Sequence, residues 1–85
     1  MSTDPLRFAQ RRAWRSTFPY WWSNLAAVYA TRTPPDMARA RRWYRRAAQA
    51  GDLRGCFEYG LMLSLGEGGA ARPAAGRLLL ERAAK

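Results

Sequence analysis

Residues 36–52, DMARARRWYRRAAQAGD, decide the fold of this chain. Small and apolar residues recur there at spacings of three and four, which places them on one side of a helix: Met37, Ala40, Trp43, Tyr44, Ala47 and Ala48. The other side carries arginines: Arg39, Arg41, Arg42, Arg45 and Arg46. Pro34 and Pro35 suit a helix start, and Gly51 suits a left-handed residue just after its end. We therefore expect an amphipathic helix from Asp36 to about Ala50, after which Asp52 can cap the next helix.

The sequence also predicts helices before and after this one. Before it lie a helix from about 5 to 15, opened by Asp4 and Pro5, and a second from about 20 to 30. After it lie helices from 53 to about 65 and from 72 or 73 to 84, joined by a glycine-rich loop that we expect to be flexible. The 53–65 helix is apolar nearly all round and is therefore expected to be the buried one. Gly60 within it is expected to let a neighbouring helix approach closely.

Composition points to one small domain, residues 1–85, with an uneven charge distribution. The net charge is +9, and residues 1–46 hold ten arginines and two aspartates, whereas residues 47–85 hold five basic and four acidic residues. Such a basic half suits an acidic protein, an anionic lipid surface or nucleic acid, although the arginines of a helix can also be merely solvated. No stretch is long and apolar enough to span a membrane, and no signal peptide is recognisable, so we expect a cytoplasmic protein.

Two blocks of the sequence repeat. Residues 25–29 align with residues 59–63 at an offset of 34, and residues 43–48 align with residues 79–84 at an offset of 36. Helix pairs that recur at this period are typical of an α-solenoid. The sequence therefore predicts an all-α fold in which 19–51 form a first helix pair and 52–85 a second, with the 5–15 helix as an N-terminal cap.

The motifs in these blocks resemble those of the Sel-one-like repeat, a relative of the tetratricopeptide repeat. WYRRAAQAGD at 43–52 is similar to the second helix of that repeat, and YGLMLSLGEGG at 59–69 is similar to its first helix and loop. Departures occur at Ala26, at Leu79-Leu80 and at Arg72, where the family pattern has glycine, Trp-Tyr and an acidic residue. The resemblance assigns structural roles to a set of residues: Trp43, Tyr44, Ala47, Ala48, Gly51, Gly60, Gly66, Ala83 and Ala84.

The resemblance implies a non-enzymatic scaffold or accessory subunit of bacterial type, with no cofactor. The residues agree, because the chain contains no histidine, no spaced carboxylate pair and no metal-ligand cluster. Cys56, the only cysteine, lies among apolar residues and is expected in the core. Two repeats are fewer than a solenoid usually needs, so the N-terminal helix or another chain must cover its end.

We expect the partner to be a protein with an acidic surface, bound through aromatic and arginine residues: Tyr20, Trp21, Trp22, Arg39, Arg42, Arg45 and Arg46. A second copy of the chain is another possible partner. Two alternatives stay open. The basic stripe could bind nucleic acid, or residues 18–22 and the N-terminal arginines could attach to an anionic membrane.

Overall fold

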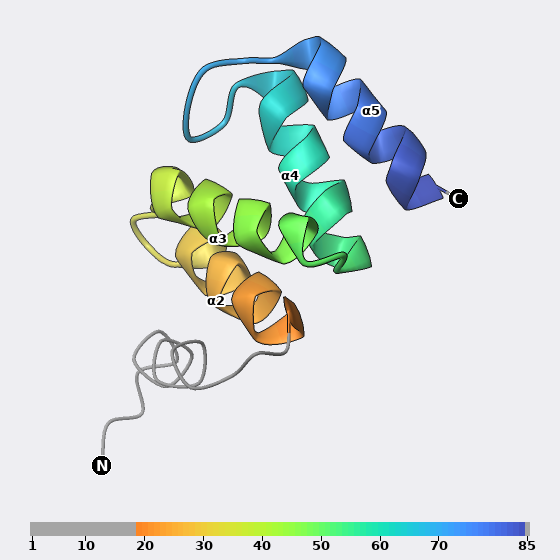
Figure 1. Cartoon of the computed structure of the whole chain (residues 1–85). Helices are drawn as coiled ribbons and strands as arrows, with labels where there is room; N and C mark the ends of the chain where they lie inside the picture. Colours follow the sequence, from red (N-terminus) through yellow and green to blue (C-terminus); the bar gives the residue numbers. More distant parts are fainter. Residues whose placement is uncertain (1–18, 85) are drawn as a thin grey trace.

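Four helices joined by short connections make up residues 19–84, the part of the chain that the computed structural model describes (Figure 1). They are α2, Pro19–Thr31; α3, Met37–Gln49; α4, Leu53–Leu65; and α5, Pro73–Ala84. The predicted bounds of these helices are confirmed to within one or two residues. The helix expected at 5–15 lies outside the described residues.

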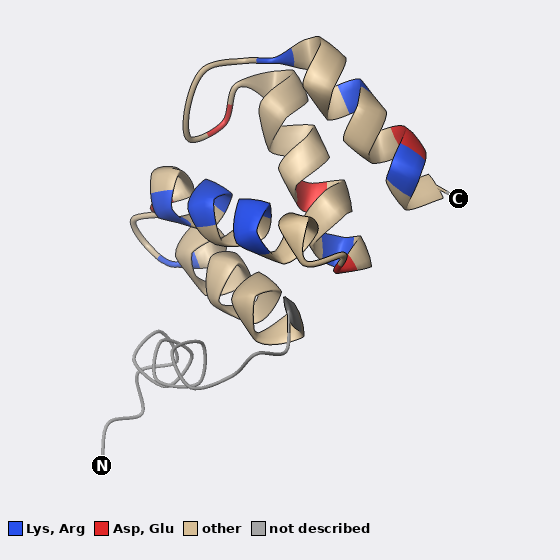
Figure 2. Ribbon diagram, in the orientation of Figure 1, with Lys and Arg blue, Asp and Glu red and all other residues tan. Residues whose placement is uncertain are grey.

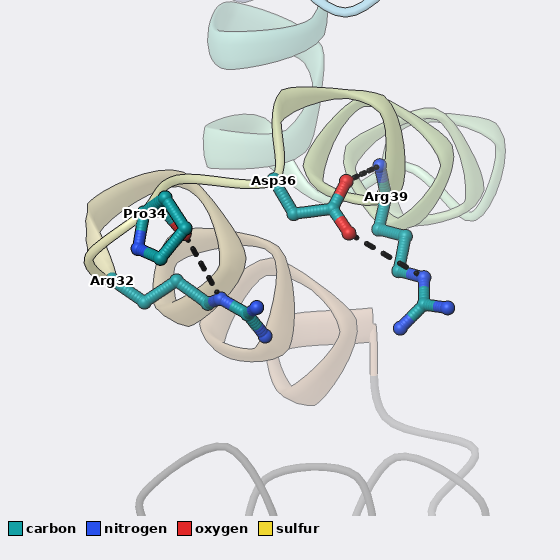
Figure 3. Close-up of polar contacts among 4 residues, drawn as sticks. All are labelled: Arg32, Pro34, Asp36 and Arg39. Carbon is teal, nitrogen blue, oxygen red and sulfur yellow. Dashed lines mark hydrogen bonds and ion pairs between the residues drawn. The ribbon is translucent and has the colours of Figure 1, made fainter.

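Local chemistry explains where α3 begins. The carboxylate of Asp36 accepts a hydrogen bond from the backbone N–H of Arg39 at 3.1 Å and lies 3.5 Å from the Nε of the same residue (Figure 3). An aspartate at this position satisfies one of the N–H groups that a helix start leaves without a partner. In the preceding connection, Arg32 Nε donates to the carbonyl oxygen of Pro34 at 3.1 Å (Figure 3). The Thr33–Pro34 peptide is cis.

The turn between α3 and α4 ends one helix and starts the next. Gly51 has φ +88°, a left-handed conformation that only glycine adopts at little cost. Asp52 follows, and its side chain accepts a hydrogen bond from the backbone N–H of Gly55 at 2.8 Å. Gly66 ends α4 in the same left-handed way, with φ +74°. The predicted roles of Gly51 and Asp52 at this turn are confirmed.

Packing follows the order of the chain. α3 packs against α2 on one side and α4 on the other, α5 packs against α4, and α2 also touches α4 (Figure 1). Consecutive helices run antiparallel. The core gathers between α2, α3 and α4, and its buried members are Leu25, Ala26, Tyr29, Ala40, Tyr44 and Met62. Trp43 is half-buried against this core, and Cys56 is buried, as its apolar surroundings predicted.

Glycines set the two closest helix crossings. A Cβ added at Gly55 would lie 2.6 Å from the Cβ of Ala47, so α4 meets α3 there without room for a side chain. A Cβ at Gly76 would overlap Ser64 and lie 2.6 Å from the carbonyl oxygen of Gly60, so α5 meets α4 in the same way. The predicted close approach at Gly60 is confirmed, since its own Cβ would lie 3.1 Å from the Gly76 carbonyl oxygen.

The C-terminal alanines do not supply such a crossing. Ala83 is only half-buried and Ala84 is exposed, whereas Ala47 and Ala48 are buried as expected. The expectation that small size at Ala83 and Ala84 brings two helices together is therefore wrong. Gly60 and Gly76, nearer the start of α5, instead allow the close approach of α4 and α5.

α4 was expected to be the buried helix, and this holds only in part: Cys56, Met62 and Leu63 are buried, but other apolar residues are not. Leu53 is 63% exposed, Phe57 47% and Leu65 67%. With three described helices as neighbours, α4 has more apolar surface than they can cover.

None of the described helices has the length and apolar character needed to cross a bilayer.

Candidate partner-binding surface

The outer side of α3 carries four exposed arginines, which we call the arginine face: Arg39, Arg42, Arg45 and Arg46. Figure 2 shows basic residues gathered along this helix. They lie on one side because spacings of three and four residues bring side chains to the same face of a helix. Each belongs to the set predicted to contact a partner, and the structure places them together on the surface.

Charge on this face is largely uncompensated. Arg39 lies beside Asp36, but within residues 19–84 no carboxylate comes within ion-pair distance of Arg42, Arg45 or Arg46. Residues 19–50 hold six arginines and one aspartate, whereas residues 51–84 hold four arginines and four carboxylates. The positive field of the described region therefore comes from α2 and α3, and it is strongest over the arginine face.

Aromatic rings hold Arg46 in place. Its guanidinium carbon lies 5.2 Å from the ring centre of Trp22 and 5.7 Å from that of Trp43, so the cation sits against one ring from α2 and one from its own helix. Such contacts are favourable and restrict a side chain that would otherwise sample many rotamers. Trp22 was predicted to contact a partner, and the structure makes it half-buried support for Arg46.

Two open hollows lie side by side along the arginine face. One, of about 200 Å³, is lined by Arg42, Trp43 and Arg46, and the other, of about 240 Å³, by Arg42, Arg45, Arg46 and Gln49. Arg42 and Arg46 therefore stand on the ridge between them. Each hollow offers guanidinium N–H groups, which match carboxylate or phosphate oxygens, and the first adds an apolar ring edge.

The other two predicted anchors lie at the start of α2. Tyr20 is 50% exposed, Trp21 is half-buried, and their ring centres are 5.2 Å apart. Their rings contact each other, and neither residue is without a partner. Both therefore have contacts within the protein, whereas the arginine face is turned to solvent.

Arg41 is the arginine whose role the sequence did not reveal. It was grouped with the solvent side of α3, but it is half-buried and donates to the carbonyl oxygens of Ala70 at 2.9 Å and Glu67 at 3.3 Å. Its guanidinium therefore holds the 66–72 loop against α3. The loop predicted to be flexible also lies so close to α3 that a Cβ at Gly68 would overlap the carbonyl oxygen of Met37.

A partly buried hydrogen bond between Ser23 and Asp52 was also not predicted from the sequence. Ser23 is 1% exposed, and its hydroxyl donates to Asp52 Oδ2 at 2.5 Å, while the same oxygen accepts from the Gly55 N–H. One carboxylate thus caps α4 and joins it to α2. The available signal was the position of Ser23, three residues before Ala26 on the apolar side of its helix.

The hydroxyl of Tyr44 lies at the edge of the core. Burial raises the pKa of Tyr44 above its ordinary value of about 10, the charge of Glu58 adds to this, and Arg54 opposes it. The folded protein therefore keeps Tyr44 protonated at a pH where the unfolded chain has begun to ionise it.

This shift makes stability depend on pH in the alkaline range. Because the folded pKa is the higher one, the contribution is fully present below pH ~10 and is lost as the pH rises through the folded value. We expect wild type to lose more unfolding free energy than Tyr44→Phe between neutral pH and about pH 11. Urea denaturation of both proteins at both pH values measures this, since groups common to both cancel. An identical loss in both proteins would contradict it.

Comparison with protein-family models, with curated proteins and with solved structures finds no match to this chain.

Proposed function

We propose that this protein is a non-enzymatic scaffold or accessory subunit that binds an acidic surface of another protein through the arginine face of α3. The observation that carries the proposal is the group of three exposed guanidiniums, Arg42, Arg45 and Arg46, that lack a carboxylate partner within residues 19–84. Arginines and aromatic rings are the residues that contribute most to binding at protein interfaces.

The proposed architecture is a short α-solenoid of two helix pairs similar to Sel-one-like repeats. Its support is the spacing of the helices: α2 and α4 begin at residues 19 and 53, 34 apart, and α3 and α5 begin at residues 37 and 73, 36 apart. These intervals agree with the two sequence offsets. Within the first pair, α3 has one side in the core and its arginine face exposed, so that face is accessible to a partner.

The size of the charged cluster favours a protein over nucleic acid. Arg42 to Arg46 span little more than one helical turn, about 6 Å along the axis. A duplex binder typically neutralises about 6–10 phosphates along a longer track. Three guanidiniums beside two small hollows suit a few carboxylates of an acidic segment, and the ring of Trp43 suits an apolar residue next to them.

A charge-reversal pair tests the proposal. Arg42→Glu/Arg45→Glu changes the arginine face while leaving Arg46 on its rings, and Arg77→Glu/Arg82→Glu makes the same change in net charge on α5. Peptides selected from a random library on the wild-type protein should be rich in Asp and Glu. We expect the α3 variant to bind them at least about 30-fold more weakly, because two attractive charges become repulsive.

The control variant on α5 should bind the selected peptides nearly as well as wild type. Equal weakening by both variants would mean that net charge, not the arginine face, governs binding, and selected peptides without acidic residues would also reject the proposal. Fluorescence anisotropy of a labelled generic DNA duplex at about 50 mM salt tests the nucleic-acid alternative. Tight binding with a steep salt dependence would favour nucleic acid as the partner.

A further inference from the structure

A stripe of apolar side chains lies exposed along α4. Its members are four residues apart, a spacing that winds slowly around a helix, and we call them the α4 stripe: Leu53, Phe57, Leu61 and Leu65. Three of them are exposed by about half or more, and Leu61 is half-buried. Isolated apolar residues on a surface are ordinary, but a row along one helix marks an interaction surface.

The stripe begins on the side of α4 opposite α3 and runs alongside α5. Gly55 faces α3, and Leu53 and Phe57 are each two residues from it, which turns them about 200° around the helix. Gly60 faces α5 and comes within about 20° of Leu53 around the helix, so α5 borders this end of the stripe. The exposure of Leu53, Phe57 and Leu65 shows that α5 leaves these side chains uncovered.

The internal repeat indicates what kind of element fits there. At an offset of 34, Phe57 corresponds to Ser23 of α2, and Ser23 is buried where α2 meets the beginning of α4. This part of α2 is therefore covered by the start of a following helix, whereas Thr31, the counterpart of Leu65, is exposed. By the same geometry, the part of the α4 stripe around Phe57 is suited to contact a helix.

Charge identifies a suitable occupant. The half of the fold that bears the stripe, residues 51–84, is balanced, with four arginines and four carboxylates, whereas residues 19–50 are strongly basic. Two copies can therefore bring their α4 ends together while their basic halves stay apart. An acidic partner, by contrast, would be drawn to the arginine face on the other half.

We propose that the α4 stripe is a self-association surface, at which two copies pack their α4 helices against each other about a two-fold axis. Such an interface is self-complementary, because the same residues are used on both copies. It leaves both arginine faces outward, so the dimer presents two partner-binding surfaces. This inference goes beyond the proposed function and stands without it, since it depends on α4 and not on α3.

The interface is small, so the dimer is expected to be weak. A 13-residue helix is about 20 Å long, and its stripe buries less than the roughly 800 Å² per partner that stable complexes use. We expect a dissociation constant of about 10–100 µM. Added salt should strengthen the dimer, because each copy carries a net charge of +9 and salt screens the repulsion between copies.

Sedimentation equilibrium of the full chain, from about 5 µM to about 500 µM, measures the association. Leu53→Gln/Phe57→Gln should raise the dissociation constant at least about tenfold, since it removes two of the three exposed apolar side chains of the stripe. Leu78→Gln is the matched control: Leu78 is 67% exposed on α5, and lies two residues from Gly76, which faces α4. The Leu78→Gln variant should dimerise like wild type.

Each result has a definite meaning. A wild type that stays monomeric over the whole range overturns the proposal, as does a stripe variant that dimerises like wild type or a control that fails to do so. If the stripe variant does not fold, NMR shift changes on dilution of wild type decide the question: changes confined to the α4 stripe support the proposal, and changes on α3 reject it. Salt separates the two proposals, since acidic peptides should bind the arginine face more weakly as salt rises.

Discussion

Replacing Gly76 with alanine is expected to lower the free energy of unfolding by about 3 kcal/mol, because the added methyl group has no room at the crossing of α4 and α5. The added Cβ would overlap the Ser64 side chain and lie 2.6 Å from the carbonyl oxygen of Gly60 and 2.9 Å from the backbone nitrogen of Ser64. Backbone atoms of α4 cannot turn aside as a side chain can. The two helices must therefore separate, and contacts along the whole crossing weaken.

Urea denaturation followed by circular dichroism measures this loss. Gly60→Ala offers a graded comparison, because its nearest neighbour would be the flexible side chain of Leu80 at 3.0 Å, and it should cost clearly less. Gly51→Ala is the control for backbone strain alone: no atom lies within 4 Å of its Cβ, but its φ of +88° should cost about 1–2 kcal/mol. If Gly76→Ala were no worse than Gly51→Ala, the close crossing of α4 and α5 would be refuted.

Asp52→Ala should lower the free energy of unfolding by about 2–3 kcal/mol. This loss combines the contribution of the helix cap with the cost of leaving a buried hydroxyl without its acceptor. The carboxylate accepts from the Gly55 N–H at the start of α4 and from Ser23 in α2. Removing it frees the first turn of α4 and leaves the Ser23 hydroxyl inside the protein without a partner. Urea denaturation measures the total loss of unfolding free energy, and faster hydrogen exchange of the first-turn amides of α4 reports the loss of the cap.

A double-mutant cycle separates these two contributions. Ser23→Ala removes the hydroxyl, so Ser23→Ala/Asp52→Ala no longer buries an unsatisfied group and should be less destabilised than the sum of the single changes by about 1 kcal/mol. Additive losses would mean that the Ser23–Asp52 bond contributes nothing to stability. Asp52→Asn should retain most of the cap, because asparagine is also a good N-cap residue.

The helices could be read from the sequence because their signals are local. The bounds of α3 follow from periodicity, from the prolines before it and from Gly51 after it, all within 20 residues. The same periodicity correctly placed Arg39, Arg42, Arg45 and Arg46 on one exposed face. A helix with a polar and an apolar side indicates by itself which side faces water.

Features that depend on how two helices meet could not be read in this way. α4 is apolar nearly all round, with Arg54 and Glu58 as its charged residues, so its sequence does not say which apolar residues remain exposed. Arg41 looks like its neighbours until the 66–72 loop brings two carbonyl oxygens within its reach. The roles of Gly55 and Gly76 likewise require the register of α4 against α3 and α5.

The order of helix contacts has a consequence for the rate of folding. Most contacts in the described region join helices adjacent in the chain, and α5 packs on α4 without touching α2 or α3. The two hairpins can therefore form from nearby segments, and little loop entropy must be lost before each contact is made. Helical proteins with such short-range contacts fold in microseconds to milliseconds. The last helix can also detach while the other three stay together, so its amide hydrogens should exchange before those of α3.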